Sequence, residues 1–322
     1  VDDEGFWSGG NWIAPEADLF DADLSGHSLV GAELFGAYLS GADLRGASLP
    51  LADLTGAYLS KANLLDANLS HTCLVAADLA EADASGANLC EAKLDGACLA
   101  GVDLRGANLA FSSLRGANLR GANFYRADLT GADLTGANLR EANLSSTILK
   151  QADLTGADLR GASLFKTDLE SATFYRTVFG FSNIVSCDLS LTIALDLARH
   201  TGPSTVGLDT LARSGGRIPR KFLEEAGVAA PLLKAQDPMM GLSRIFPSVL
   251  TIGSMEDRAF AERLRASLQA AQIPCWSIAP DDEASLQAGE TVLSHTAYFD
   301  KVVLLCTESS LQSPQTRRYM SE

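Results

Sequence analysis

The chain has 322 residues, of which 47% are hydrophobic, and its formal net charge is −15 at pH 7. This length allows two or three domains, and no unbroken apolar run reaches membrane length, so we expect a soluble protein. Its six cysteines are scattered without a CxxC pair or histidines at ligand spacing. That pattern argues against a zinc site and favours free thiols in a reducing cytoplasm.

The charge is distributed unevenly along the sequence. Residues 1–103 contain 17 acidic against 3 basic side chains, whereas residues 104–190 contain 8 against 9. The first part of the chain is therefore predicted to form an acidic end. The later part carries a set of arginines: Arg115, Arg120, Arg126, Arg140, Arg160 and Arg176.

The first segment, residues 1–16, is apolar and aromatic. It contains Phe6, Trp7, Trp12 and Ile13, more large apolar side chains than a solvated tail needs. Because an open end of a β structure invites aggregation, we expect this segment to cap the region that follows. A frayed terminus is the alternative.

Residues 17–190 form an internal repeat with a period of five. From Leu19 to Leu189 there are 35 pentads, and leucine occupies the central position in 30 of them. The residue two positions before the centre is alanine in 26 pentads. On an α-helix, a five-residue period distributes the leucines around the whole circumference. On a flat strand, it places successive leucines on opposite faces. The chain must therefore turn once in every pentad.

Within one pentad the alanine and the leucine are two positions apart, so both point to the same side of an extended segment. Glycine is frequent two positions after the centre, where it supplies the backbone freedom of a bend. A coil wound about an axis gives every leucine a common interior, and stacked coils pair as parallel strands. The predicted core is represented by Leu19, Leu44, Leu119, Phe124, Leu134 and Leu159.

The stretches GADLTGANLREANL and RGANLRGANF resemble the pentapeptide repeat family. This resemblance implies a mainly β fold, a right-handed quadrilateral parallel β-helix with four pentads in each coil. It also implies about nine coils and an interior filled by leucine and alanine. Any activity of this region is then expected on its outer faces or at its ends.

Residues 191–247 lose the period and are expected to form a connector of loops with a short helix. Pro219 is expected to open that helix over residues 220–226, and Gly227 to end it. His200, Ser204 and Asp209 contain the groups of a hydrolytic triad, but they lie together in a loop-rich stretch without a nucleophile elbow. We therefore expect no hydrolase site there.

Residues 248–322 change to an alternation of strands and helices. Short strands are predicted around Val249–Ile252, Ile273–Ile278 and Val302–Cys306, with an amphipathic helix between the first two. Such βαβ alternation predicts a parallel sheet. The stretches EDRAFAERLRASLQAAQIPCWSIAPDD and DKVVLLCTESSLQSP are similar to the bacterial Toll/interleukin-1 receptor (TIR) family. The similarity covers about the first half of such a domain, so we expect a partial, flavodoxin-like α/β unit.

Some TIR relatives hydrolyse NAD with a glutamate four residues after a tryptophan. Alignment to that motif places Gln315 at the tryptophan and Tyr319 at the glutamate, so the matching position has no carboxylate. Glu322, three residues further, is a weak substitute. The resemblance therefore implies no confident catalytic residue and no cofactor, with NAD relevant only to the enzymatic alternative.

The acidic loop of Asp281, Asp282 and Glu283 corresponds to an assembly surface in the resembling family. As neighbouring carboxylates without a second cluster, the three favour an interaction surface over a metal site. We thus expect a non-catalytic scaffold in which a rigid rod presents a TIR-like module for self-association or signalling, in bacterial stress or antiviral defence. The first alternative is an NAD hydrolase. A lower alternative is a DNA mimic that binds a topoisomerase, and neither membrane nor nucleic-acid binding is expected.

Overall fold

The structure is a computed structural model whose chain divides into two compact units, Val1–Ser243 and Arg244–Glu322. Among the residues that it describes, no helix is long and apolar enough to cross a membrane. The described residues are 5–230, 233, 249–253, 262–264, 266, 267, 275–278 and 301–305.

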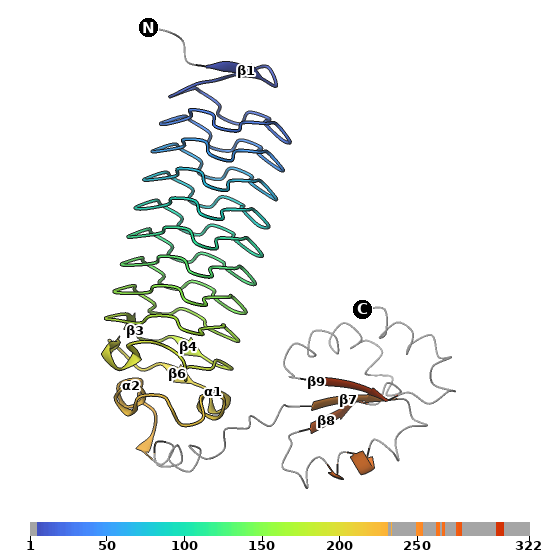
Figure 1. Ribbon diagram of the computed structural model, residues 1–322, viewed down its shortest axis with the longest axis vertical. Coiled ribbons are helices and arrows are strands. Elements are labelled where there is room, and N and C mark those ends of the chain that lie inside the picture. The colour runs from blue at the N-terminus through green and yellow to red at the C-terminus, as the bar shows by residue number, and fades with distance from the viewer. Residues whose placement is uncertain are drawn as a thin grey trace. The chain divides into compact units, whose positions relative to one another are not determined.

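The first unit is a stack of coils (Figure 1). Residue Asp18 forms a parallel bridge with Tyr38, and Tyr38 with Tyr58, so equivalent positions recur every 20 residues. The same ladder is bonded through the backbone, as where the amide of Leu39 donates to the carbonyl of Tyr58 at 2.7 Å. The β-coil expected from the period is confirmed, and so are the four pentads in each turn that the family resemblance implied.

The core of the coil consists of the central residues and of the residues two positions before them. Leucines such as Leu44, Leu119 and Leu159 are fully buried, as are alanines such as Ala117 and Ala137. Phe124 is also fully buried in the leucine position. Since a methyl group is the largest side chain that fits beside most leucines, alanine at this position follows from packing.

Each pentad ends in a tight turn at which the chain changes direction. The amide of Ala22 donates to the carbonyl of Leu19 at 3.1 Å, and Asp21 inside this turn has a φ of 51°. A positive φ at the third residue is the feature of a type II turn, which favours glycine. Glycine is therefore frequent at this position, and residues such as Glu141 adopt the same conformation with a φ of 61°.

Hydroxyl residues replace the inward alanine where they can bond to the backbone of the previous coil. The Thr147 hydroxyl donates to the carbonyl of Phe124 at 2.7 Å, and the Thr177 hydroxyl donates to that of Leu154 at 2.6 Å. Both threonines are buried. A buried hydroxyl without such a partner costs about 1–3 kcal/mol, so these bonds make the substitution acceptable.

The aspartate or asparagine in front of many leucines has a structural role on the outside of the coil. A side-chain oxygen of Asp53 accepts the amide of Thr55 at 2.9 Å, and that of Asp78 accepts the amide of Ala80 at 3.0 Å. Asparagines also bond to one another between coils, as where Asn138 donates to Asn118 at 3.0 Å. Aspartate and asparagine therefore belong to the repeat itself.

A two-stranded hairpin stands at the start of the rod. Strands β1 (Phe6–Ser8) and β2 (Asn11–Ile13) are antiparallel and joined by Gly9 and Gly10, whose φ values of 56° and 80° suit a two-residue turn. Ile13 is buried in the common core, whereas Trp7 is 69% exposed. The hairpin therefore covers the first coil mainly through its second strand.

The coil continues past residue 190 with a changed spacing. The strand β3 pairs in parallel with β5, and β4 with β6. Val178 lies opposite Arg199, 21 positions later, and Asn183 lies opposite Thr205, 22 positions later. The bounds of the four strands are Val178–Phe179 for β3, Asn183–Ile184 for β4, Arg199–His200 for β5 and Thr205–Val206 for β6.

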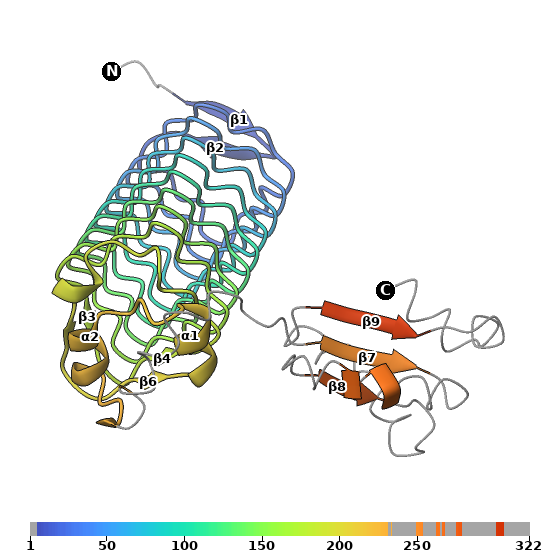
Figure 2. The same ribbon diagram turned by 60° about the horizontal axis from the view of Figure 1, so that its bottom comes forward.

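Short helices cover the last coil (Figures 1 and 2). Leu211, Phe222 and Leu223 are buried in the same core as the leucines of the rod. The Phe222 ring meets that of Phe179 edge-on at 5.4 Å. Part of the segment expected to be a connector, from residue 195 to 228, thus packs on the rod. The helices are η1 (Leu195–Leu197), α1 (Leu208–Arg213) and α2 (Arg220–Glu225).

The second unit contains a three-stranded parallel sheet. Strand β7 (Val249–Gly253) lies between β8 (Cys275–Ile278) and β9 (Lys301–Leu305). Residues 262–264, 266 and 267 are helical and fall between the first two strands. The three strands lie close to the positions expected from the sequence, and they pair in parallel.

Candidate interaction surface

The residues that the sequence singled out fall into two groups. The predicted core residues Leu19, Leu44, Leu119, Phe124, Leu134 and Leu159 are buried in the rod. The acidic loop of Asp281, Asp282 and Glu283 and the catalytic candidates Tyr319 and Glu322 lie outside the described residues. The geometry of the described chain therefore concerns the rod and its cap.

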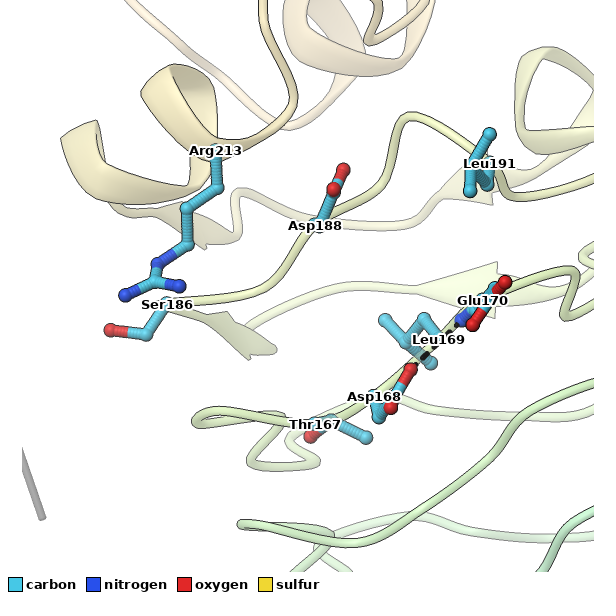
Figure 3. A pocket seen from close by; sticks show the side chains of 8 residues that line it. All are labelled: Thr167, Asp168, Leu169, Glu170, Ser186, Asp188, Leu191 and Arg213. Atoms are coloured by element: carbon cyan, nitrogen blue, oxygen red, sulfur yellow. Dashed lines mark hydrogen bonds between the residues drawn. The ribbon is translucent and has the colours of Figure 1, made fainter. Parts of the chain in front are cut away.

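A surface hollow of about 290 Å³ lies beside the last coils and α1 (Figure 3). Two of its carboxylates form ion pairs on the surface of the rod, because Lys150 Nζ lies 2.8 Å from Glu170 and 3.4 Å from Asp168. No group of three metal-ligating side chains is found within the described part of the chain. We assign no chemistry to this hollow, which is lined by Thr167, Asp168, Leu169, Glu170, Ser186, Asp188, Leu191 and Arg213.

A second surface hollow, of about 470 Å³, follows a column of arginines. Arg120, Arg140 and Arg160 occupy the position after the central leucine on three successive coils, so they lie one above another. Neighbouring strands are about 4.8 Å apart, which sets the spacing of the three side chains. The remaining lining residues are Glu141, Gly161, Phe181 and Thr201.

Ion pairs within the chain orient these arginines. Arg120 reaches Glu141 on the next coil at 3.0 Å, and Arg140 lies 3.4 Å from Asp158. Arg160 also pairs with Asp158. Burial raises the pKa of the Asp158 carboxyl, but the hydrogen bonds and charge of Arg160 and Arg140 outweigh it and leave that pKa below its usual value. Three cations share two carboxylates here, so the column is basic.

The first half of the same side of the rod is aromatic and acidic. Tyr38 and Tyr58 stack with ring centroids 5.1 Å apart and an interplanar angle of 5°. Phe20, one coil earlier, is 65% exposed. Asp78 and Glu81 follow on the next coil. An exposed aromatic cluster with flanking charge is typical of a surface that binds another macromolecule.

His200, Ser204 and Asp209 do not form a catalytic triad. The Ser204 hydroxyl lies 3.4 Å from His200 Nδ1, but the Asp209 carboxylate accepts a hydrogen bond from Ser186 instead. The imidazole stacks on Phe179 and meets Phe222 edge-on, and burial lowers its pKa. Its contacts are those of a side chain packed between the last coil and α2.

The arginine column was not assigned to one surface from the sequence. The sequence shows only that the later coils carry six arginines, in contrast to the acidic first coils. Reading the sequence at intervals of 20 separates them, because 120, 140 and 160 share one column whereas 115, 126 and 176 lie on other columns. This assignment requires the number of pentads in a coil.

A family profile described as pentapeptide repeats matches eight copies within the chain. Together the matches span residues 16–190, more than half of the 322 residues. No curated protein sequence matches. The matched stretches are 16–49, 37–74, 72–109, 103–140, 112–151, 137–174 and 152–190.

Three solved structures are reported as similar to the chain, and two of them are described as pentapeptide repeat proteins. HetL, involved in heterocyst differentiation regulation in the cyanobacterium Nostoc, is 30% identical over 60% of this chain and 90% of its own, with a TM-score of 0.30. Rfr23 from the cyanobacterium Cyanothece is 38% identical over 28% of this chain and 62% of its own, with a TM-score of 0.28. QnrB1, a plasmid-mediated fluoroquinolone resistance protein, is 17% identical over 55% and 91%, with a TM-score of 0.39.

Proposed function

The chain belongs to the pentapeptide repeat family, and from this premise we propose that it is a non-catalytic interaction scaffold. Its rod is the right-handed β-helix of that family. In this proposal the rod offers its outer faces to protein partners, and the second unit is a TIR-like module that assembles with other copies. The resemblance of that unit connects the proposal to bacterial stress or antiviral defence in the cytoplasm.

The observation that carries the proposal is the filled interior of the rod. Central and inward residues from Leu29 to Phe174 are at most 3% exposed. Both hollows open at the surface, and Glu170 in the first and Arg120 and Glu141 in the second are held in ion pairs within the chain. A closely packed rod with charged and aromatic outer columns is suited to binding large partners and not to enclosing a small substrate.

The proposed module is supported by the parallel sheet of the second unit. Its strand order, with β7 between β8 and β9, is the order of the first three strands of a flavodoxin-like sheet. This order agrees with the TIR-like stretches of the sequence. Assembly through the loop that contains Asp281, Asp282 and Glu283 is an inference from that resemblance.

Charge reversal in this loop is expected to change the oligomer. Asp282→Lys should lower the average mass of the full chain measured by light scattering across a concentration series, because it removes a carboxylate from the proposed assembly surface. Asp66→Lys is the matched control, since Asp66 is exposed on the rod and Lys61 already occupies an equivalent turn position. Equal masses for both variants and the parent chain would contradict assembly through the loop.

The alternative function, NAD hydrolysis, is tested separately. We expect no nicotinamide release from NAD by the full chain above a heat-denatured control, because Tyr319 stands where the carboxylate is required. Loss of a single electrostatic stabiliser commonly costs a factor of about 10²–10³ in rate. Turnover that disappears in Glu322→Gln but persists in Tyr319→Phe would instead assign the function to a hydrolase.

The proposal of DNA mimicry receives less support from the described surface. Carboxylates such as those of Asp53 and Asp78 bind the backbone of their own turns, so they are part of the repeat. The arginine column gives one side of the later coils the opposite sign. A surface that changes sign along its length is unlike the uniform charge of a duplex.

A further inference from the structure

One side of the rod differs in character between its two halves. We call this side the Leu19 face, and its ladder of parallel bridges is continuous from Asp18 to Val178. The face presents three outward columns, which lie one position before, one position after and two positions after each central residue. Its central residues are Leu19, Leu39, Leu59, Leu79, Leu99, Leu119, Leu139, Leu159 and Phe179.

The two halves of the Leu19 face carry opposite net charge. The first four coils present four carboxylates against one lysine, and the last four present three arginines against two carboxylates. The acidic half also holds the Tyr38–Tyr58 stack and Phe20, whereas Phe181, which is 71% exposed, ends the basic half. The charged residues are Asp18, Asp21, Lys61, Asp78 and Glu81, and then Arg120, Arg140, Glu141, Asp158 and Arg160.

The middle of the Leu19 face is flat. The coil centred on Leu99 presents Cys98, Ala100 and Gly101 to the outside, and in the preceding coil the short Ala80 lies between Asp78 and Glu81. These short side chains allow a second backbone to come close. A face with a flat centre and halves of opposite charge is complementary to itself when one copy is reversed.

We infer that two copies of the rod pair through the Leu19 face, antiparallel, about a two-fold axis at the Leu99 coil. An axis parallel to the strands reverses the order of the coils and preserves each residue's position within its pentad. A two-fold contact joins the same patch of both copies, so every cross-contact occurs twice. The partner is therefore a second copy of this chain.

In the column one position after each central residue, the sizes of the side chains fit this two-fold symmetry. Under the two-fold, Ala80 faces Arg120 of the other copy, Ser60 faces Arg140 and Ser40 faces Arg160. At the ends Phe20 faces Gly180. Each long side chain in one half of the column thus meets a short one in the other half, so the columns interlock without a clash.

In the two other columns, charge pairs and a contact between arginine and an aromatic ring fit the same symmetry. Lys61 faces Glu141 of the other copy. Arg120 enters between Asp78 and Glu81, which stand on either side of the Ala80 that it faces. Arg140 enters beside Tyr58, where a guanidinium stabilises an aromatic ring by about 0.5–2 kcal/mol.

The arginines are already oriented for this contact. Bonds to Glu141 and Asp158 fix Arg120, Arg140 and Arg160 in the free rod, so pairing orders few further rotamers. Each guanidinium has five donors, and the bonds within the chain use only part of them. The remaining donors are available to the acidic half of the second copy.

The area of the face is sufficient for a specific dimer. Nine coils at about 4.8 Å give a length of ~40 Å, and sheets ~10 Å apart with their outer side chains give a width of roughly 15–20 Å. The product, roughly 600–800 Å², approaches the ~800 Å² that each partner buries in a standard interface.

Cys98 provides a direct test because it lies on the two-fold axis and faces its own copy. In a full chain with Cys73, Cys90, Cys275 and Cys306 changed to serine, a short bis-maleimide should yield covalent dimers at low protein concentration. The remaining thiol, Cys187, is buried, and this burial raises its pKa to about 12, so it should not react. Cys98→Ser should abolish the product. Failure to form dimers when Cys98 reacts singly would overturn the proposal.

The matched pair of variants is Ala100→Arg and Ser85→Arg. At the axis two arginines would meet, and we expect dimerisation to weaken at least tenfold in sedimentation equilibrium. Arginine already occupies the column of Ala100 on three coils, so the fold should tolerate it. Ser85→Arg lies on another face and repeats the Asp103–Arg105 arrangement, so it should leave the dimer unchanged. Equal behaviour of both variants would refute pairing through this face.

The inference uses rod residues alone and goes beyond the proposed function. Asp282→Lys should leave the Cys98 crosslink intact, whereas Ala100→Arg should remove it. Failure of module assembly and failure of rod pairing are therefore distinguishable. Higher salt should also weaken pairing, since exposed charges contribute to it.

Discussion

Replacing Ala117 by tryptophan is expected to lower the free energy of unfolding by about 3 kcal/mol or more. Ala117 is fully buried beside the central leucines, and the interior has no space for an indole. Its carbonyl accepts the amide of Asn138 at 2.9 Å on the next coil. Because the backbone must move outward to admit the ring, bonds between coils are lost together with the packing.

The neighbouring position supplies the control. Asn118→Trp places the same ring one residue later, in an outward column that already holds Tyr38 and Tyr58. It loses the hydrogen bond from Asn138, which we expect to cost about 1–2 kcal/mol. Urea unfolding followed by circular dichroism compares the two variants. Equal stabilities would contradict the inward and outward assignment on which the coil depends.

The coil could be predicted from the sequence because its rule is local. A period of five with alanine and leucine two apart requires one turn in each pentad and one shared interior, and the burial of Leu44 and Ala137 follows from that geometry. The number of pentads in a coil came from resemblance, because any closed polygon satisfies the same local rule. The columns of the Leu19 face depend on this number.

Of the cap, only the helix α2 was predicted, from Pro219 and Gly227. The remaining coil past residue 190 could not be predicted, because its spacing drifts. Residues facing each other are 20 apart along most of the rod, then 21 apart at Val178 and Arg199 and 22 apart at Asn183 and Thr205. Inserting one residue moves later side chains out of the five-residue frame while the backbone continues to pair. The five-residue period therefore ends before the stacked coil ends, and no pattern in the sequence indicates that residues such as Leu211 are buried.

Drift in spacing also explains why the cap needs helices. Without a further regular coil stacked on it, the last coil would expose Phe179 and its neighbours as an apolar end. The segments α1 and α2 carry Leu211, Phe222 and Leu223 to cover that end. An uncovered end would present both apolar surface and unpaired strand edges, which promote end-to-end association of repeat proteins.

Phe222→Ala is therefore expected to open the capped end of the rod. The Phe222 ring is 1% exposed and packs edge-on against Phe179 and His200, so its removal should cost about 3–5 kcal/mol. Because each coil contacts mainly its neighbours, the loss should fall on the cap and the last coil and not on the whole rod.

Hydrogen exchange can localise this effect. The amides of Thr201 and Thr205 bond to the previous coil, to Phe179 and Ser182 at 2.9 Å each. Their exchange should accelerate by a factor of about 10²–10³ in Phe222→Ala, while amides near Leu99 keep their protection. Leu208→Ala, at a side chain that is 62% exposed on α1, should change neither set. Uniform acceleration along the rod would show instead that the coils unfold as one unit, and unchanged exchange at Thr201 and Thr205 would show that α2 does not hold the end closed.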